Sequence, residues 1–470
     1  MRALQRGAED SKKWLRRFFD ILNSPKMLRI FGEFPSYAFL RWFIMLIHVV
    51  ASGDTVTSVA ARYGVDPARL AADNDVPQNG ALAVGQTLVV LFPRTVHAVR
   101  AGETLTSIAQ SYSVPLIQLY QNNITLRAQS TLAVGQTLVI EYTGEKRGTL
   151  AVNAYAEPGI DAAYLQTALP YLTYLTPFTY GISAAGALVP LDDAALITAA
   201  AQYGAQPLMH ISSLTEQGTF SNERSSLVLG DAQRRGALIT DILQTIRTRG
   251  YYGLDVDFEF IPANEREAYV TFLQELRGAL NPLSHPLLAA LAPKTSARQR
   301  GLLYEGHDYA LIGSAVNAVL LMTYEWGYTY GPPMAVAPLP QVRRVLDYAL
   351  TEIAPEKIFL GIPNYGYDWT LPFEEGTSRA QSISSRRAIE LAVQHRASIE
   401  YDQTARSPYF YYTDALSKQH VVWFEDARSI EEKLALAAQS GLQGVGYWNL
   451  MRPFSQNWLV LNALYNIEKI

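Results

Sequence analysis

The sequence predicts an α/β protein in which a (β/α)8 barrel with a small α+β insertion follows two small βααβ modules. Three observations lead to this fold class. Residues 48–88 recur in closely similar form as residues 97–138. From residue 150 onward, short apolar runs alternate with helix-like stretches. One of these runs carries three carboxylates at alternate positions, Asp255, Asp257 and Glu259.

The composition limits the class of protein. A chain of 470 residues is too long for one ordinary domain and suits a barrel with smaller modules. A hydrophobic content of 49% with only 17% charged residues indicates a well-packed globular protein. The net charge of −4 gives no electrostatic reason to expect nucleic acid as a partner. The chain has no cysteine, which excludes disulfides and thiolate metal sites.

Residues 1–44 do not match the pattern that follows them. The segment 11–22 predicts a short basic amphipathic helix, and the apolar run 37–50 is interrupted by Arg41 and too short to span a bilayer. We find no clear signal peptide and expect no obligatory membrane contact, although a helix on a membrane surface is one interpretation. The preferred interpretation is a non-native extension with translation beginning at Met45, because the first strand of the repeat starts there.

The repeat predicts two modules, at residues 46–92 and 95–142. The first copy opens with HVVASGDTVTSVA at His48 and the second with HAVRAGETLTSIA at His97, and both close with LAVGQTL. Each copy reads as strand, glycine turn, two helices, Gly-Gln turn and strand, with an acidic residue and a threonine opening the first helix as capping residues. The polar, glycine-containing stretch 143–149 is predicted to be a linker.

Both copies resemble LysM modules, which bind glycans containing N-acetylglucosamine, such as peptidoglycan and chitin. In that family the sugar lies in a groove between the first strand–helix loop and the loop after the second helix. The resemblance implies glycan contacts at Gly53, Asp54, Thr55, Gly102, Glu103, Thr104, Asn122 and Asn123. The two glycines also suit a purely conformational role in their turns.

The remaining residues, 150–470, predict the barrel. The alternation of apolar and helix-like runs is typical of a parallel sheet with helices outside it, and such barrels carry the active site at the C-terminal ends of their strands. The long interval before the last strand predicts an inserted subdomain around residues 376–426. The strands are expected at 150–155, 174–178, 206–211, 253–259, 287–293, 318–324, 357–363 and 444–448.

The three carboxylates predict a catalytic site. Side chains alternate along a strand, so Asp255, Asp257 and Glu259 are expected on one face, with Leu254, Val256, Phe258 and Phe260 on the other. An isolated buried carboxylate is costly, whereas crowded carboxylates raise one another's pKa, so that one can stay protonated and act as a general acid. A solvated strand face or a metal site is the alternative, but no histidine or cysteine lies nearby in the sequence to complete a zinc site.

The run Gly-x-Asp-x-Asp-x-Glu resembles the fourth-strand signature of the family 18 glycoside hydrolases, chitinase-like barrels that use substrate-assisted catalysis. The family's longer pattern begins with an Asp where this chain has Tyr252, a position outside the run of acids. The resemblance implies that Glu259 is the general acid and then the base. Asp257 would orient the 2-acetamido group of the substrate, and Asp255 would share a proton with Asp257. It implies no metal and no cofactor.

Other predicted strand ends supply further site residues. The family usually has Met-x-Tyr-Asp at the end of strand six, where the Tyr and the acid hold the N-acetyl group. Here Tyr324 matches and Glu325 is one methylene longer than the usual Asp. Trp448 stands where the family places a tryptophan floor under the reacting sugar, and Tyr365 and Tyr367 are expected to form a glycan-binding wall after strand seven.

The combination of two LysM modules with a family 18 barrel resembles the cortex-lytic glycosidases of spore-forming bacteria. It implies a monomeric N-acetylglucosaminidase that acts on peptidoglycan in the spore cortex or coat, or in the cell wall. A chitinase or chito-oligosaccharidase, which would use the same residues, is one alternative. The alternative of another class is a non-catalytic glycan-binding protein, although such members of the family usually lose the Glu.

Overall fold

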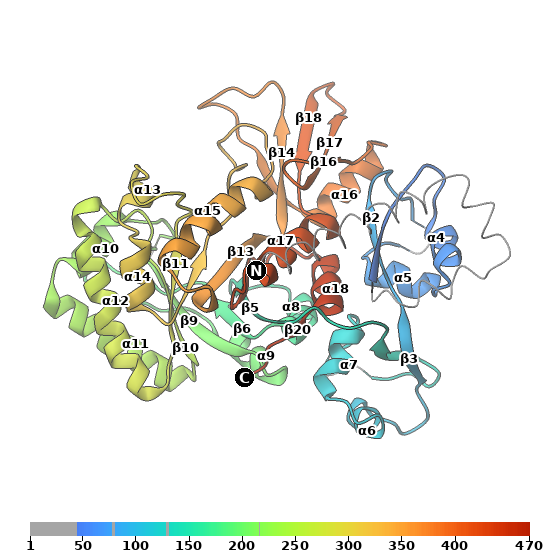
Figure 1. Ribbon diagram of the computed structural model, residues 1–470, viewed down its shortest axis with the longest axis horizontal. Coiled ribbons are helices and arrows are strands. Elements are labelled where there is room, and N and C mark those ends of the chain that lie inside the picture. The colour runs from blue at the N-terminus through green and yellow to red at the C-terminus, as the bar shows by residue number, and fades with distance from the viewer. Residues whose placement is uncertain (1–44, 78–79, 128–130, 216) are drawn as a thin grey trace, which may run out of the picture.

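The computed structural model describes residues 45–470, except 78–79, 128–130 and 216. The extension expected at residues 1–44, with its amphipathic helix, lies outside the described residues. In the described part of the chain, no helix is long and apolar enough to cross a membrane. The ribbon shows the barrel and its helices beside the two modules, which lie next to the C-terminal helix (Figure 1).

Within the described residues, eight parallel strands close into a barrel, because the last strand pairs with both the seventh and the first. This arrangement confirms the predicted (β/α)8 fold. In chain order the barrel strands are β5 (Thr149–Ala156), β6 (Tyr174–Pro177), β9 (Gln206–Ser212), β10 (Gly253–Asp257), β11 (Leu287–Leu291), β12 (Ala318–Leu321), β13 (Ile358–Pro363) and β19 (Gly444–Trp448).

Helices of the barrel domain follow these strands and cover the outside of the barrel. They are α8 (Ala162–Ala168), α9 (Ala194–Gln202), α10 (Asn222–Leu229), α11 (Ala232–Arg249), α12 (Arg266–Leu280), α13 (Leu302–Glu305), α14 (Tyr309–Ala315), α15 (Leu339–Glu352), α17 (Ala427–Gln439) and α18 (Ser455–Leu464). Three short strands accompany them, β7 (Gly181–Ile182), β8 (Leu188–Val189) and β20 (Asn466–Ile467).

Side chains along each barrel strand point alternately outward, to the core under the helices, and inward, to the interior of the barrel. On β10, Leu254 and Val256 belong to the large core that packs strands against helices. Asp255 and Asp257 therefore point into the barrel. The interior below them is filled by apolar side chains, Ala151, Tyr155, Tyr174, Leu208, Leu288, Ala318, Leu320 and Phe359. Two carboxylates thus lie directly above an apolar layer.

An inserted subdomain separates β13 from β19. Its five-stranded sheet consists of β14 (Tyr365–Thr370), β15 (Gln381–Ser384), β16 (Glu400–Asp402), β17 (Ser407–Thr413) and β18 (Gln419–Trp423), with the helix α16 (Ser385–Gln394) beside it. The insertion was expected around residues 376–426, but β14 already pairs with β15 and β18 and belongs to this sheet. The inserted sheet therefore starts directly after barrel strand β13.

The two N-terminal modules have the predicted βααβ order. They consist of β1 (Met45–Val49), α4 (Val56–Tyr63), α5 (Pro67–Asp73) and β2 (Thr87–Leu91), then β3 (Pro93–Ala98), α6 (Leu105–Ser111), α7 (Leu116–Asn122) and β4 (Thr137–Tyr142). The two strands of each module pair antiparallel. Thr55 and Thr104 each form a capping box at the first helix of their module, as the capping pattern predicts.

Helix α18 is the surface on which both modules pack. All of its residues are buried. Gln456 bonds the first module, donating to the Thr87 carbonyl at 2.7 Å and to Asn74 Oδ1 at 3.1 Å. Asn462 bonds the second, donating to the Gln121 carbonyl at 3.0 Å and to Asn122 Oδ1 at 3.1 Å. The modules and the barrel therefore share one polar interface.

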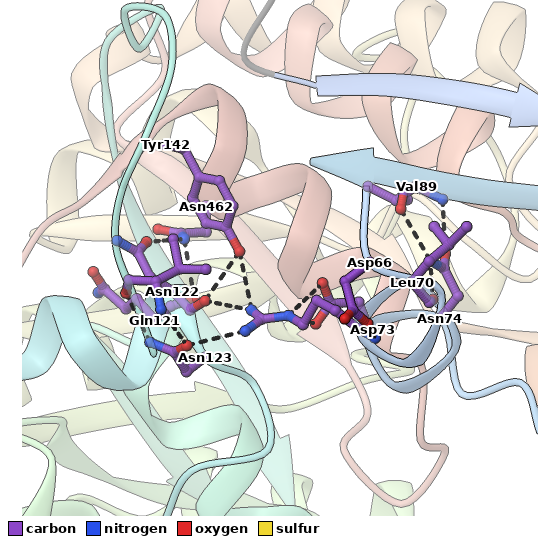
Figure 2. Close-up of polar contacts among 12 residues, drawn as sticks. Asp66, Leu70, Asp73, Asn74, Val89, Gln121, Asn122, Asn123, Tyr142 and Asn462 are labelled. Atoms are coloured by element: carbon purple, nitrogen blue, oxygen red, sulfur yellow. Dashed lines mark hydrogen bonds and ion pairs between the residues drawn. The ribbon is translucent and has the colours of Figure 1, made fainter. Parts of the chain in front are cut away.

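Arg69 on α5 joins the first module to the second. Its guanidinium pairs with Asp73 at 2.7 Å and donates to the Asn122 carbonyl at 2.6 Å, to Asn123 Oδ1 at 3.0 Å and to the Tyr142 hydroxyl at 3.0 Å. These partners gather around one point between the modules (Figure 2). The second copy has Gln118 at the position equivalent to Arg69, so it has no arginine there to contact the first module.

The predicted linker at 143–149 is held against the barrel domain. Arg147 donates its backbone N–H to the Leu464 carbonyl at 2.6 Å, and Lys146 Nζ donates to Asn462 Oδ1 at 3.1 Å. Thr149 already belongs to β5. The connection is therefore hydrogen-bonded to the barrel domain at Lys146 and Arg147, although most of its residues are exposed.

Arg69→Ala should loosen the N-terminal modules, because it leaves the buried carboxylate of Asp73 without its cation. We expect the free energy of unfolding of the modules to fall by about 3 kcal/mol, measured by urea unfolding. Arg62→Ala is the matched control, since Arg62 is 51% exposed where it pairs with Asp54 and such pairs contribute less than about 1 kcal/mol. Equal losses in the two variants would contradict this account of Arg69.

Candidate active site

A cleft of about 580 Å³ opens at the C-terminal ends of the barrel strands. It brings together five of the predicted site residues, Asp257, Glu259, Tyr324, Glu325 and Trp448. Further aromatic side chains line it, Tyr155, Phe178, Phe220, Phe260, Tyr304, Trp326 and Tyr328. Asp255 lies beneath the cleft and is fully buried.

The strand that carries the acids ends earlier than predicted. Strand β10 stops at Asp257, so Glu259 lies two residues beyond it rather than on the strand face. Pairing with β11 ends at Val256 and pairing with β9 ends at Asp257, so beyond Asp257 neither neighbouring strand holds the backbone extended. Phe260 then takes a left-handed backbone conformation with φ of 55° and lines the cleft, instead of pointing to the opposite face.

Asp255 accepts a hydrogen bond of 2.7 Å from the hydroxyl of Tyr155 on β5. Burial raises the pKa of Asp255 to about 6, and the Tyr155 hydrogen bond opposes this rise. The other carboxylate oxygen, Oδ1, is buried with no partner among the described residues. Asp255 can therefore take up a proton close to neutral pH.

Asp257 lies between two other carboxylates. Burial, followed by the charges of Glu259 and Asp255, raises its pKa well above the usual value. On the neighbouring strand β9, His210 Nε2 is 3.8 Å from Asp257 Oδ2. Burial holds the pKa of His210 down to about 3, so the imidazole is neutral. The pocket thus favours a protonated Asp257 until a ligand arrives that stabilises its charge.

Glu259 is half-buried and lines the cleft. Burial, together with the charge of Glu325, raises its pKa to about 7. A carboxylic acid with this pKa holds a proton at neutral pH and can transfer it.

Among the residues that the structure describes, no group of three histidine or acidic side chains is placed to hold a metal ion.

Glu325 faces the cleft from the loop after β12. Its Oε1 accepts hydrogen bonds from the hydroxyls of Tyr365, at 2.5 Å, and Tyr367, at 2.9 Å. These two tyrosines were expected at the end of strand seven, but they lie on β14 of the inserted sheet. The insertion therefore provides one wall of the site. Tyr324 is 9% exposed beside Glu325, and burial raises its pKa well above the usual value.

His307 supports the segment that carries Glu259. Its Nδ1 accepts from the backbone N–H of Ala292 at 2.9 Å, so Nε2 carries the hydrogen and donates to the Phe258 carbonyl at 3.0 Å. Sequence analysis missed His307, as it missed Tyr155 and His210. The position of Tyr155 at the end of a predicted strand was a usable signal for that residue, whereas His307 stands in a loop with no local pattern.

Asn122 and Asn123, for which the LysM resemblance predicts glycan contacts, have buried side chains. They are 6% and 2% exposed. The Asn123 amide donates to the Leu119 and Val139 carbonyls and accepts from the Val139 N–H. Asn74 makes the same bonds in the first module. Each buried amide bonds backbone groups of both the second helix and the last strand of its module, and so holds the strand to the helix.

The first loop of each module keeps an exposed glycine, Gly53 or Gly102, at a φ of 86° or 83°. The acids that follow bond within the module: Asp54 pairs with His48 at 3.0 Å, and Glu103 pairs with His97 at 2.7 Å. These acids therefore have an internal structural role. The expected glycan contacts at Gly53, Asp54, Thr55, Gly102, Glu103 and Thr104 remain predictions.

A barrel with acids at the C-terminal ends of its strands and an aromatic cleft is compatible with a glycoside hydrolase. The family model for glycosyl hydrolases family 18 matches residues 206–452, and the LysM domain model matches residues 48–91 and 97–141. The chain belongs to family 18 of the glycoside hydrolases and carries two LysM domains ahead of its barrel.

Two of the relatives match this chain over about nine tenths of its length. The cortical fragment-lytic enzyme of Bacillus subtilis is 41% identical over 433 residues, which span 90% of this chain and 99% of that protein. The crystal structure of the Bacillus cereus spore cortex-lytic enzyme SleL matches with a TM-score of 0.77 at 39% identity, over 91% of this chain and 99% of that one. A chitinase from Chromobacterium violaceum, at 24% identity and a TM-score of 0.62 over 67% of this chain and 98% of that one, shares the fold.

Glu325→Gln should lower the pKa of Glu259 below about 7, because it removes a negative charge that opposes ionisation. The Glu259 carboxyl is followed by infrared titration. Its signal is the difference between each protein and the same protein that also carries Glu259→Gln. Glu390→Gln, on the exposed side of the insertion, serves as the control and should leave the titration unchanged. An unchanged midpoint in the Glu325 variant would show that burial alone sets the pKa.

Proposed function

We propose that the protein hydrolyses N-acetylglucosamine linkages in peptidoglycan, with the spore cortex as its site of action. The crowded buried carboxylates of Asp255, Asp257 and Glu259 carry this proposal, because their arrangement suits a substrate that brings its own nucleophile. Relatives that match nearly end to end are named as cortical fragment-lytic and cortex-lytic enzymes. This supports the cortex over chitin as the source of substrate.

Glu259 acts first as the general acid and then as the base. Protonated near neutral pH, it gives its proton to the leaving oxygen of the glycosidic bond as that bond breaks. The 2-acetamido carbonyl of the reacting sugar attacks the anomeric carbon and forms an oxazolinium ion. Glu259, now ionised, removes a proton from the water that opens this ring. The product retains the anomeric configuration, and the enzyme returns to its starting protonation.

Asp257 holds the acetamido group during this attack. Its carboxylate accepts the amide N–H and stabilises the positive charge that develops on the ring. The proton of resting Asp257 passes to Asp255, whose pKa of about 6 suits it to share that proton. Tyr324 and Glu325 hold the acetamido group from the other side, and Trp448 forms the floor under the sugar.

The LysM domains anchor the enzyme to insoluble glycan. Two weak binding sites on one body raise the effective concentration of substrate at the cleft. The shared interface on α18 supports this proposal, since it fixes both modules relative to the barrel. We therefore expect the glycan strand to be presented to the cleft in a set orientation.

Glu259→Gln should lower kcat by at least about 10²-fold, because the side chain keeps its shape and loses its transferable proton. Asp257→Asn should also cripple hydrolysis, but through loss of the charge that stabilises cyclisation. A preformed oxazoline donor distinguishes the two variants, since it is already cyclised and does not need Asp257 for that step. Transfer from this donor, followed by mass spectrometry, should persist in the Asp257 variant. Comparable circular dichroism spectra would establish that both variants fold.

The wild type should also be inhibited by a thiazoline analogue of the cyclised intermediate. Two results together would contradict the mechanism. They are an absence of inhibition by the thiazoline, and the isolation of a covalent glycosyl ester on Asp257. In that case the carboxylate itself would be the nucleophile.

A further inference from the structure

The segment that carries Glu259 lies beyond the barrel sheet. Strand β10 ends at Asp257, and its pairing with the two neighbouring strands ends there or one residue earlier. Within the described ranges, the Glu259 carboxyl forms no hydrogen bond of its own, and burial and the charge of Glu325 are what act on it. The direction in which this acid points therefore depends on how the backbone around it is held.

A loop at residues 305–307, at the end of α13, holds the segment just before Glu259. Nε2 of His307 donates a hydrogen bond of 3.0 Å to the Phe258 carbonyl. Both side chains are fully buried, so water does not compete for this bond. Nδ1 of the same ring accepts from the Ala292 N–H, just after β11, at 2.9 Å. One imidazole thus ties the segment to the neighbouring strand at the point where sheet pairing has ended.

The same loop contacts the segment again just after Glu259. A Cβ on Gly306 would lie 2.3 Å from the Cβ of Ile261 and 2.4 Å from the Ile261 carbonyl oxygen. These distances are far below ordinary van der Waals contact, so only a glycine lets the loop approach so closely. Glu259 is therefore held between two contacts that come from one loop.

Two basic side chains fix the loop in turn. Lys294 is 2% exposed, and its Nζ donates to the His307 carbonyl at 2.7 Å. Arg266 donates to the Glu305 carbonyl through Nε at 2.9 Å and through Nη2 at 2.7 Å. The loop is thus anchored at both of its ends, as a support for a precisely placed side chain requires.

We propose that the 305–307 loop aims the Glu259 carboxyl at the leaving oxygen, with His307 as the positioning residue. This inference rests on the proposed function, in which Glu259 protonates that oxygen. His307 is fully buried and acts on the reaction only through the backbone of Phe258. A general acid works within hydrogen-bond reach of the atom that it protonates, and a displacement of about 1 Å can cost about 10²-fold in rate.

The test compares two probes that differ in how much they need the acid. One is a peptide-free tetrasaccharide of peptidoglycan, whose leaving group is a sugar hydroxyl. The other is the disaccharide N-acetylmuramyl-N-acetylglucosamine joined to dinitrophenol, which leaves without needing a proton. For both probes, kcat/KM reports cleavage of the glycosidic bond.

His307→Asn should separate the two probes, because the shorter amide can still accept from the Ala292 N–H but cannot reach the Phe258 carbonyl. On the tetrasaccharide, kcat/KM should fall at least about tenfold. The loss should appear in kcat rather than in KM. The dinitrophenyl glycoside should be cleaved close to the wild-type rate, and this rate also counts the folded active sites in each variant.

Three further variants sharpen the comparison. His307→Gln places an amide N–H near the position of Nε2 and should recover part of the loss. Gly306→Ala removes no hydrogen bond but forces Ile261 to shift, so it should reproduce the pattern of His307→Asn. His285→Asn is the matched control, since Nδ1 of His285 donates to the Tyr252 carbonyl at 2.9 Å at the opposite end of β10. This control should cleave both probes as the wild type does.

Two outcomes for His307→Asn would overturn the role of the loop. They are an equal loss on both probes, which would make the loop a general structural support, and an unchanged rate on the tetrasaccharide. Glu259→Gln is the reference, and an equal loss on both probes in that variant would instead contradict the acid role within the proposed function. A wild type that leaves the tetrasaccharide intact would overturn the proposed function, and this inference with it.

Discussion

The site depends on the cost of burying several carboxylates together. Asp255 and Asp257 point into the barrel above an apolar layer, and Glu259 closes the group from the loop beyond β10. In such surroundings all three cannot be ionised at once, because each charge opposes the next and little water remains to stabilise it. One hydroxyl, from Tyr155, and one neutral imidazole, from His210, adjoin the group without neutralising it. The barrel thus keeps protons on these acids at a pH where isolated carboxylates have lost them.

Sequence reasoning predicted the features that local periodicity encodes. The two-residue period around Asp257 located the acids, and the repeat located both modules. Contacts that join distant segments were not predictable in this way. Glu259 leaves the strand because pairing with both neighbours, β11 and β9, stops before it, and both neighbours are more than thirty residues away in the chain. The LysM resemblance predicts a glycan contact at Asn123, and it gave no sign that the amide of this residue bonds backbone groups of α7 and β4. His307 reaches the Phe258 carbonyl across the fold.

The LysM domains form part of the same packed body as the barrel. Arg69 joins one module to the other, and on α18 Gln456 bonds the first module and Asn462 the second. The ribbon shows α18 beside both modules (Figure 1), and the contacts of Asn462 with Gln121 and Asn122 are drawn in Figure 2. A rigid arrangement of this kind costs less entropy on binding a long glycan than modules on flexible tethers would. Under the proposed function, anchoring and cleavage are therefore linked by geometry. The inserted sheet, through Tyr365 and Tyr367, contacts Glu325 of the cleft from the same packed body.

The central claim is that the acetamido group of the substrate, held by Asp257, attacks the anomeric carbon. Replacing the N-acetyl group of an activated substrate by N-fluoroacetyl, N-difluoroacetyl and N-trifluoroacetyl weakens the carbonyl oxygen as a nucleophile while nearly preserving its shape. Measuring kcat/KM across this series tests the claim most directly. The account predicts a steep fall in rate with each added fluorine. Rates that stay level across the series would contradict it, because a nucleophile supplied by the enzyme would not depend on the acyl group.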